Sequence, residues 1–142
     1  MVSVSQLLLQ KPRMLHGIGP DRPVLDAVRL MADHGVGALL VMENERLVGI
    51  VSERDYARKV ILKGRSSADT PVRDIMTAQV ITVQPETSTE ACMQLMTERR
   101  VRHLPVLQSG RVVGMLSIGD LVRSVLAEQQ RTIEQLESYI HS

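Results

Sequence analysis

Short apolar runs alternate with helical patterns along this chain, in an order that occurs twice. Apolar residues recur at helical spacing over residues 24–31, which predicts a helix that ends at Gly35, because glycine suits the left-handed position after a last turn. Strands are predicted over 39–42 and 47–51, and the polar turn between them has the spacing of a β-hairpin. A further helix is expected over 53–62.

The second half of the chain repeats this pattern at an offset of 65 residues. Aligning Leu30–Val60 with Leu95–Val125 without a gap gives 12 identities in 31 positions. The elements predicted for the second copy are a helix over 88–99, strands over 104–107 and 112–116, and a helix from residue 118. An extended piece that ends in Pro20 or Pro85 precedes the first helix of each copy. The chain is therefore built from a duplicated β-α-β-β-α unit.

Three segments lie outside the core of the repeat. Residues 63–69 form a polar linker, and Thr70-Pro71 starts a short predicted helix through Met76, with Thr70 as its N-cap. After the second copy the last helix continues, and apolar residues approximate one stripe on it, at Val122, Leu126, Ile133, Leu136 and Ile140. Fewer than three clean heptads support this stripe, so it indicates a partner helix without establishing a coiled coil.

Composition narrows the possible functions. The chain has 142 residues, of which 44% are hydrophobic and 23% charged, as in a globular domain. A net charge of +1 gives no excess of cations for a polyanion, and two Tyr with no Phe or Trp cannot form stacking platforms for bases. We therefore expect no nucleic-acid partner. One cysteine, Cys92, excludes a disulfide framework or a thiolate cluster.

The chain shows no targeting or membrane signal. Its first nine residues lack a basic region and contain three consecutive Leu, which is not the pattern of a signal peptide. The apolar run over 38–42 is far shorter than the roughly 20 residues of a membrane-spanning helix. We expect a soluble, cytoplasmic protein with no membrane partner.

The repeat resembles a pair of cystathionine-β-synthase (CBS) domains, of the kind found in small stand-alone bacterial CBS-pair proteins. Each copy closes with Ser-x-x-Asp after a strand that contains glycine. The likeness covers about residues 4–127, and the stretches that carry it are 48–56, Val72-Arg73-Asp74-Ile75-Met76-Thr77, Arg102-His103-Leu104-Pro105-Val106 and 113–120.

The resemblance implies an α+β fold, in which two pseudo-symmetric β-α-β-β-α units pack sheet to sheet as one Bateman-type module. The boundaries expected from it are a first unit with a short N-terminal helix over 1–62, a linker over 63–71, a second unit over 72–127 and a helical extension over 128–142. It also implies that an adenosyl ligand such as AMP, ATP, NAD or S-adenosylmethionine binds between the units, and that two copies associate through their helices into a flat homodimer.

The repeated Ser-x-x-Asp suits a nucleoside for a chemical reason. A ribose presents two neighbouring hydroxyl donors, and an ionised Asp in the first turn of a helix can accept from both. Helix N-termini also attract phosphate, and an Arg beside one of them adds a fork of donors. The same motif is a capping box, which forms for local reasons alone. Both interpretations stay open, since one residue can serve both.

Carrying the family's cleft over to this chain gives two candidate nucleotide sites. The first combines Ser117, Asp120, Met115, Arg102 and His103 with Leu15, His16, Val36 and Gly37. The second combines Ser52, Arg54, Asp55, Ile50, Gly37 and Ala38 with Gln79, Ile81, Val101 and Arg102, and Arg58 is a further candidate for a phosphate. The two sites cannot be equivalent, because Arg102-His103 of one copy aligns with Gly37-Ala38 of the other.

The leading hypothesis is a regulatory nucleotide sensor with no catalytic activity of its own. The alternative is a CBS-fold interaction or dimerisation module without a physiological nucleotide. An enzyme is disfavoured, because no pair of base and nucleophile, metal set or P-loop is present, and Cys92 falls among helical core positions. The downstream partner, the ligand's identity and the direction of the signal are left open by the sequence.

Overall fold

The computed structural model describes residues 2–11 and 15–141. It divides into two compact units, which differ from the boundaries that the sequence suggests. Met14–Ile81 is called here the first-repeat unit, and Met1–Arg13 together with Thr82–Ser142 the second-repeat unit. The N-terminal helix, expected in the first unit, thus lies with the second repeat.

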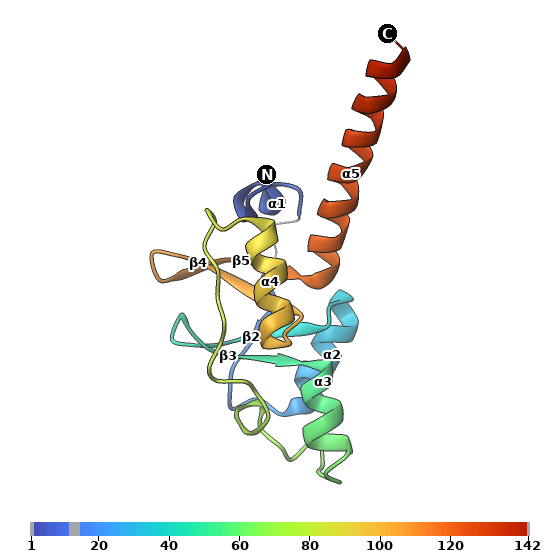
Figure 1. Ribbon diagram of the computed structural model, residues 1–142. Coiled ribbons are helices and arrows are strands. Elements are labelled where there is room, and N and C mark those ends of the chain that lie inside the picture. The colour runs from blue at the N-terminus through green and yellow to red at the C-terminus, as the bar shows by residue number, and fades with distance from the viewer. Residues whose placement is uncertain (1, 12–14, 142) are drawn as a thin grey trace. The chain divides into compact units, whose positions relative to one another are not determined.

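The first-repeat unit is a three-stranded sheet covered by helices (Figure 1). Its elements are β1 (Gly17–Ile18), α2 (Val24–His34), β2 (Ala38–Glu43), β3 (Arg46–Ser52), α3 (Glu53–Tyr56), the π-helical turn η1 (Ala57–Ile61) and the 3-10 turn η2 (Val72–Asp74). Strand β1 runs parallel to β2, which pairs antiparallel with β3. The buried core consists of Ile18, Val24, Ala27, Met31, Leu39, Val41, Val51, Val60, Val72 and Ile75.

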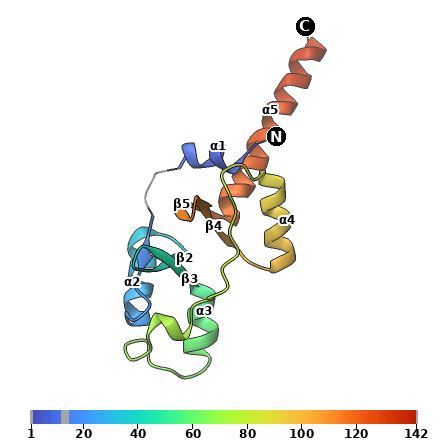
Figure 2. The same ribbon diagram turned by 90° about the vertical axis from the view of Figure 1, so that its left-hand side faces the viewer.

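The second-repeat unit has the same plan with a longer last helix. Its elements are α1 (Val4–Leu9), α4 (Thr89–Arg99), β4 (His103–Gln108), β5 (Arg111–Ser117) and α5 (Ile118–His141). The hairpin β4–β5 is joined by an isolated parallel bridge from Val83 to Val106. Helix α5 continues well past α4, and its second half extends beyond the rest of the unit (Figures 1 and 2).

The two repeats agree residue by residue at the offset of 65. Helices α2 and α4, hairpins β2–β3 and β4–β5, and the register shifts after Val41 and Val106 all coincide at this spacing. Both hairpin turns have positive φ at their two central residues, Asn44-Glu45 and Ser109-Gly110, which is the geometry that matches the twist of the strands. The α+β fold and the duplication predicted from the sequence are therefore confirmed.

A second correspondence, at an offset of 68, relates the segments that lead into each repeat. Val4 N donates to Thr87 O at 2.8 Å, and in the other unit Val72 N donates to Arg22 O at the same 2.8 Å. A side chain on Gly114 would collide with Leu8, as one on Gly49 would collide with Met76. Residues 2–9, which lead into the first repeat, thus pack on the second repeat, and residues 70–77 pack on the first.

Three predicted elements differ from the structure. The helix expected over 70–76 is the short turn η2, because the Thr70 carbonyl accepts from Val24 N at 2.8 Å and the Thr70 hydroxyl donates to Ser66 O at 2.6 Å, so neither group starts a helix. Helix 53–62 widens into η1 after Tyr56. The extended piece that ends in Pro85 contributes a single bridge, from Val83 to Val106, rather than a strand.

The C-cap of helix α4 is Arg100, a left-handed residue that is not glycine. It has φ +56°, at the position that Gly35 occupies after α2, and a left-handed residue other than glycine is strained. We expect Arg100→Gly to raise the free energy of unfolding by about 0.5–1 kcal/mol, the relief of strain less the greater freedom of glycine in the unfolded chain.

The matched control is Arg99→Gly, which makes the same chemical change one residue earlier, inside the helix. It should lower the free energy of unfolding by about 0.5–1 kcal/mol. Urea denaturation measures both values, and a destabilised Arg100→Gly would contradict the prediction.

Candidate functional site

In the second-repeat unit, the turn from β5 into α5 fixes Asp120 in a capping box. The Asp120 Oδ2 accepts hydrogen bonds from Ser117 N at 2.8 Å and from Ser117 Oγ at 3.0 Å. The Ser117 Oγ in turn accepts from Asp120 N at 3.2 Å. Both ends of the motif are satisfied locally, so the capping interpretation of Ser-x-x-Asp is confirmed as geometry.

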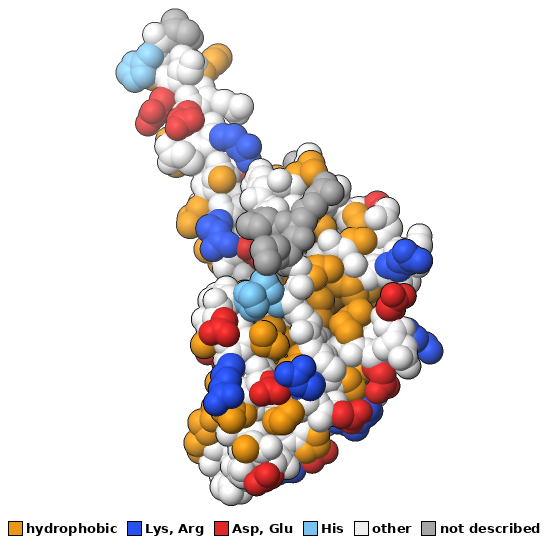
Figure 3. Space-filling view, turned by 180° about the vertical axis from the view of Figure 1, so that it is seen from behind, with side chains coloured by type: hydrophobic (Ala, Val, Ile, Leu, Met, Phe, Trp, Pro, Cys, Tyr) orange, Lys and Arg blue, Asp and Glu red, His pale blue; other side chains and the backbone are white. Residues whose placement is uncertain are grey.

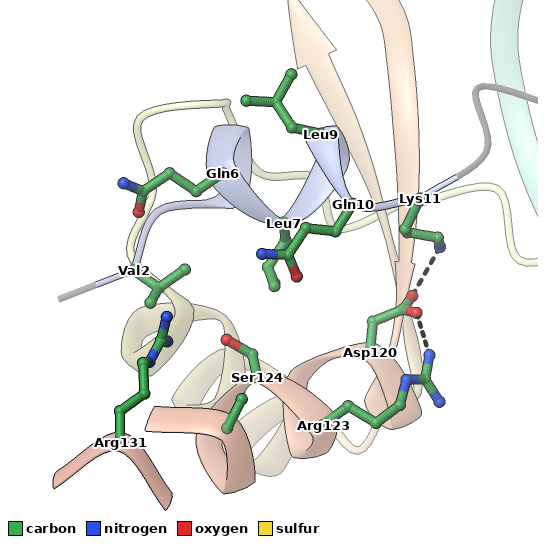
Figure 4. A pocket seen from close by; sticks show the side chains of 11 residues that line it. Val2, Gln6, Leu7, Leu9, Gln10, Lys11, Asp120, Arg123, Ser124 and Arg131 are labelled. Carbon is green, nitrogen blue, oxygen red and sulfur yellow. Dashed lines mark hydrogen bonds and ion pairs between the residues drawn. The ribbon is translucent and has the colours of Figure 1, made fainter. Parts of the chain in front are cut away.

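Two cations hold the same carboxylate from opposite sides (Figure 4). Lys11 Nζ donates to Asp120 Oδ2 at 2.7 Å and also to Met115 O at 2.7 Å. Arg123 donates to Asp120 Oδ1 at 2.6 Å. The Asp120 side chain is 7% exposed. Burial raises the pKa of Asp120, but the hydrogen bonds from Lys11 and Ser117 outweigh it, so the pKa lies below its usual value.

Neighbouring candidates surround this helix start. Arg102 O accepts from Ile118 N at 2.8 Å, which places the backbone of Arg102 against the first turn of α5. His103 pairs with Ser117 across the hairpin. Burial lowers the pKa of His103, and the positive charges of Lys11 and Arg102 lower it further against the opposing effect of Asp120. His103 is therefore a neutral imidazole at pH 7.

The first-repeat unit repeats this geometry at the start of α3. Asp55 Oδ2 accepts from Ser52 N and Ser52 Oγ, both at 3.0 Å, and Glu53 N donates to Gly37 O at 3.0 Å as Ile118 does to Arg102. The cation here is different, since Lys59, one turn along the helix, lies 3.1 Å from Asp55 Oδ1. The Asp55 side chain is 14% exposed.

Other candidates of the first-repeat unit lie on the strands beside this box. Ala38 pairs with Ser52 across the hairpin, and Ile50 exchanges backbone hydrogen bonds with Thr77, two residues before Gln79. His16 O accepts from Leu40 N, and its imidazole stacks on His34 with centroids 3.9 Å apart. Burial and then the charge of His34 lower the pKa of His16.

The structure brings the candidates together within each unit. The second-repeat unit holds six of them, which are Ser117, Asp120, Met115, Arg102, His103 and Val101. The first-repeat unit holds the other twelve candidates, which are Leu15, His16, Val36, Gly37, Ala38, Ile50, Ser52, Arg54, Asp55, Arg58, Gln79 and Ile81. The clefts that would join the two sets stay a prediction.

Three cations at the boxes were missed by the sequence analysis. Arg123 aligns with Arg58 in the repeat, and Lys59 stands four residues after Asp55, so both could have been found from spacing. Lys11 lies 109 residues from Asp120 and has no signal in the sequence.

Other kinds of site find no support in the described part of the chain. No group of three or more His, Cys, Asp or Glu side chains is placed to hold a metal ion among residues 2–11 and 15–141. Within the same ranges, no helix has both the length and the apolar character to cross a membrane.

Comparison with known proteins agrees with the fold. The family model for the CBS domain matches residues 15–62 and 72–127. The chain is 50% identical over 125 residues to the mitochondrial CBS domain-containing protein CBSX3 of Arabidopsis thaliana, a match that covers 84% of this chain. It spans 61% of the length of that relative.

Solved structures show the same likeness. A protein with CBS domains from Burkholderia ambifaria MC40-6 is 53% identical, with a TM-score of 0.88 over 90% of this chain and 96% of that one. The CBS domain pair of protein MJ0100, in complex with 5′-methylthioadenosine and S-adenosyl-L-methionine, has a TM-score of 0.80 over 89% of this chain and 98% of that one. At 21% identity, the likeness to MJ0100 is one of fold.

We expect Asp120→Asn to lower the free energy of unfolding by about 2 kcal/mol at neutral pH, because it removes the charge that Lys11 and Arg123 meet. The matched variant Asp55→Asn should cost about 1 kcal/mol, since its cation Lys59 is 44% exposed and more screened by solvent.

The difference between Asp120→Asn and the wild type should depend on pH. Because the folded pKa of Asp120 is lowered, its contribution is complete above the unfolded pKa and is lost as the pH falls through the folded one. Urea denaturation from neutral pH down to about pH 3 measures it. A difference that stays constant over this range would contradict the assignment.

Cys92 should be chemically inert in the folded protein. Its side chain is buried, and burial raises the pKa of the thiol to about 11, so little thiolate exists near neutral pH. Ellman's reagent should react with one thiol per chain in denaturant and with almost none in the native state. Rapid reaction of the native protein would show that the thiol is accessible.

Proposed function

Because the chain belongs to the CBS-domain family, we propose that it is a regulatory module that binds an adenine nucleotide, such as AMP, ATP or NAD, and reports its occupancy by a change in packing. CBS pairs are regulatory modules, and MJ0100, which shares the fold, binds the adenosyl compounds 5′-methylthioadenosine and S-adenosyl-L-methionine. No catalytic step is assigned to this chain.

The observation that carries the proposal is the repeated carboxylate at a helix start. Asp55 and Asp120 take the same place in two equivalent turns, each held by its own serine at 3.0 Å. Rigid placement of an ionised acceptor lowers the entropy cost of binding a diol. In each site we assign this acceptor to the two ribose hydroxyls.

The cations beside each carboxylate suit a phosphorylated ligand. A carboxylate has about four acceptor positions, two on each oxygen. At Asp120, Oδ2 accepts from Ser117 N, Ser117 Oγ and Lys11 Nζ, and Oδ1 accepts from Arg123, so fewer than two positions are open to a diol. A ribose that takes its place on Asp120 displaces a cation, which is then available to a phosphate. At Asp55 the same exchange would release Lys59.

The two sites differ in the groups that would complete them. Arg54, at the start of α3, has Gly119 as its counterpart, and Arg102 and His103 have Gly37 and Ala38. We assign Arg54, Arg58, Arg102 and His103 to phosphates. The residues assigned to the adenine and the ribose edge are Leu15, His16, Val36, Gly37, Ala38, Ile50, Gln79, Ile81, Val101 and Met115. One site should therefore bind more tightly than the other.

A second candidate function is an interaction module, favoured by the exposed apolar side chains of α5. Large apolar side chains are exposed along it, with Leu126 at 59%, Leu136 at 58% and Ile140 at 73%. Figure 3 shows such side chains between charged ones on the projecting half of this helix. In this alternative the helix mediates a homodimer and the boxes serve as caps alone. For either function we propose the cytoplasm as the compartment, although the name of the Arabidopsis relative places that protein in mitochondria.

Thermal melting distinguishes the two functions. With ligand-free protein, we expect a saturable rise of the melting temperature with at least one of AMP, ATP, NAD, S-adenosylmethionine and 5′-methylthioadenosine, because a ligand that binds the folded state stabilises it by mass action. Asp55→Ala should cost at least about 1 kcal/mol and Asp120→Ala at least about 2 kcal/mol, because each loses a cap together with its ion pairs, and one of the two variants should also abolish the ligand shift.

The interaction module predicts the loss of stability alone. Absence of a shift with the whole panel would overturn the nucleotide proposal, as would a shift that both variants retain unchanged. Mass spectrometry of small molecules released from natively purified protein would identify the ligand.

A further inference from the structure

A cavity of about 630 Å³ lies wholly within the second-repeat unit, between α1 and the first four turns of α5. Val2, Leu7, Leu9 and Ala127 give it apolar walls. Its polar lining consists of Gln6, Gln10, Lys11, Asp120, Arg123, Ser124 and Arg131. Asp120 borders it, but most of these residues take no part in the capping box.

The charge of this lining is strongly positive. Lys11, Arg123 and Arg131 carry three positive charges, and Asp120 is the one carboxylate among the described lining residues. The lining therefore has a net charge of +2, whereas the whole chain has +1. A concave site with this balance attracts an anion.

Two of the cations are held ready to bind. The hydrogen bonds among described residues use two of the three donors of Lys11 and one of the five donors of Arg123. Asp120 fixes both groups, so their other donors are ordered before a ligand arrives. Ordering them beforehand lowers the entropy cost of binding.

The cations stand at opposite ends of the cavity. Figure 4 shows Arg131 at one end and the Lys11–Asp120–Arg123 group at the other, with Gln10 and Ser124 between them. Arg131 stands eight positions after Arg123 on α5, which is a rise of about 12 Å along the helix. The long side chains of the two arginines can reach toward each other across this distance and contact the same ligand. This spacing suits an extended anion better than a single phosphate.

We propose that this cavity binds an oligophosphate, held by Lys11 and Arg123 at one end and by Arg131 at the other. The oligophosphate comes either from a free polyphosphate or from the tail of a nucleoside triphosphate. The second source rests on the proposed nucleotide function, whereas the first does not.

Titration calorimetry with inorganic tripolyphosphate at fixed ionic strength tests the cavity directly. The wild-type protein should bind one tripolyphosphate per chain in a saturable manner. Arg131→Gln, on the exposed face of a helix, should bind it about tenfold more weakly or worse, as expected for one lost charge-assisted hydrogen bond.

The matched control is Arg29→Gln, which removes the same charge from the exposed surface of α2 in the other unit. Its affinity for tripolyphosphate should equal that of the wild type. Absence of saturable binding would overturn the proposal, and so would equal weakening in both variants, because that result would mean attraction by net charge alone.

ATP and AMP separate the two sources. If Arg131→Gln weakens the binding of ATP and leaves the binding of AMP unchanged, the tail of a bound nucleotide occupies the cavity. If the affinity for tripolyphosphate depends on Arg131 while the affinity for ATP does not, the cavity binds a free polyphosphate. If no adenosyl compound binds but the affinity for tripolyphosphate still depends on Arg131, the proposed nucleotide function is wrong and the oligophosphate site is supported.

Discussion

The structure depends on the exchange of leading segments between the repeats. A hairpin with helices on one side leaves part of its sheet uncovered, and in each unit a leading segment closes it through buried apolar side chains, Val4 and Leu7 in one and Val72 and Ile75 in the other. Gly49 and Gly114 allow this approach, because a Cβ at either position would lie within 2.6 Å of an atom of the covering segment. Each repeat receives its cover from the sequence that precedes the other repeat. The second-repeat unit is therefore discontinuous, since Met1–Arg13 joins Thr82–Ser142, whereas the first-repeat unit is the continuous stretch Met14–Ile81.

The exchanged segment also supplies a charged side chain to the candidate site of the second-repeat unit. Lys11 follows directly after α1, so the segment that covers β5 also delivers a cation to Asp120 and to the Met115 carbonyl. The equivalent position at the offset of 68 is Gln79, and there the cation comes instead from Lys59 of the adjoining helix. The two boxes are thus alike in their backbone and different in the origin of their charge, which is a physical basis for two unequal sites.

Capping and binding are compatible uses of one carboxylate. The serine and the backbone hold Asp55 and Asp120 in place whether or not a ligand is present, and the cost of removing them from water is met by hydrogen bonds and cations. At Asp120 these interactions outweigh burial, so the group stays ionised and can accept hydrogen bonds. A local stability device of this kind is well suited to become a binding device, because its geometry is already determined.

The sequence by itself determined the repeat, the α+β fold and the positions of the boxes, because periodicity, turn residues and capping signals act over a few residues and occur twice at one spacing. Arg123 and Lys59 were within reach of the same reasoning. Tertiary structure decided which unit holds α1, that residues 70–76 form a turn rather than a helix, and that Lys11 meets Asp120. These outcomes depend on which surface a short apolar segment covers, and that choice is set by packing between residues far apart in the chain, which leaves no periodic trace in the sequence.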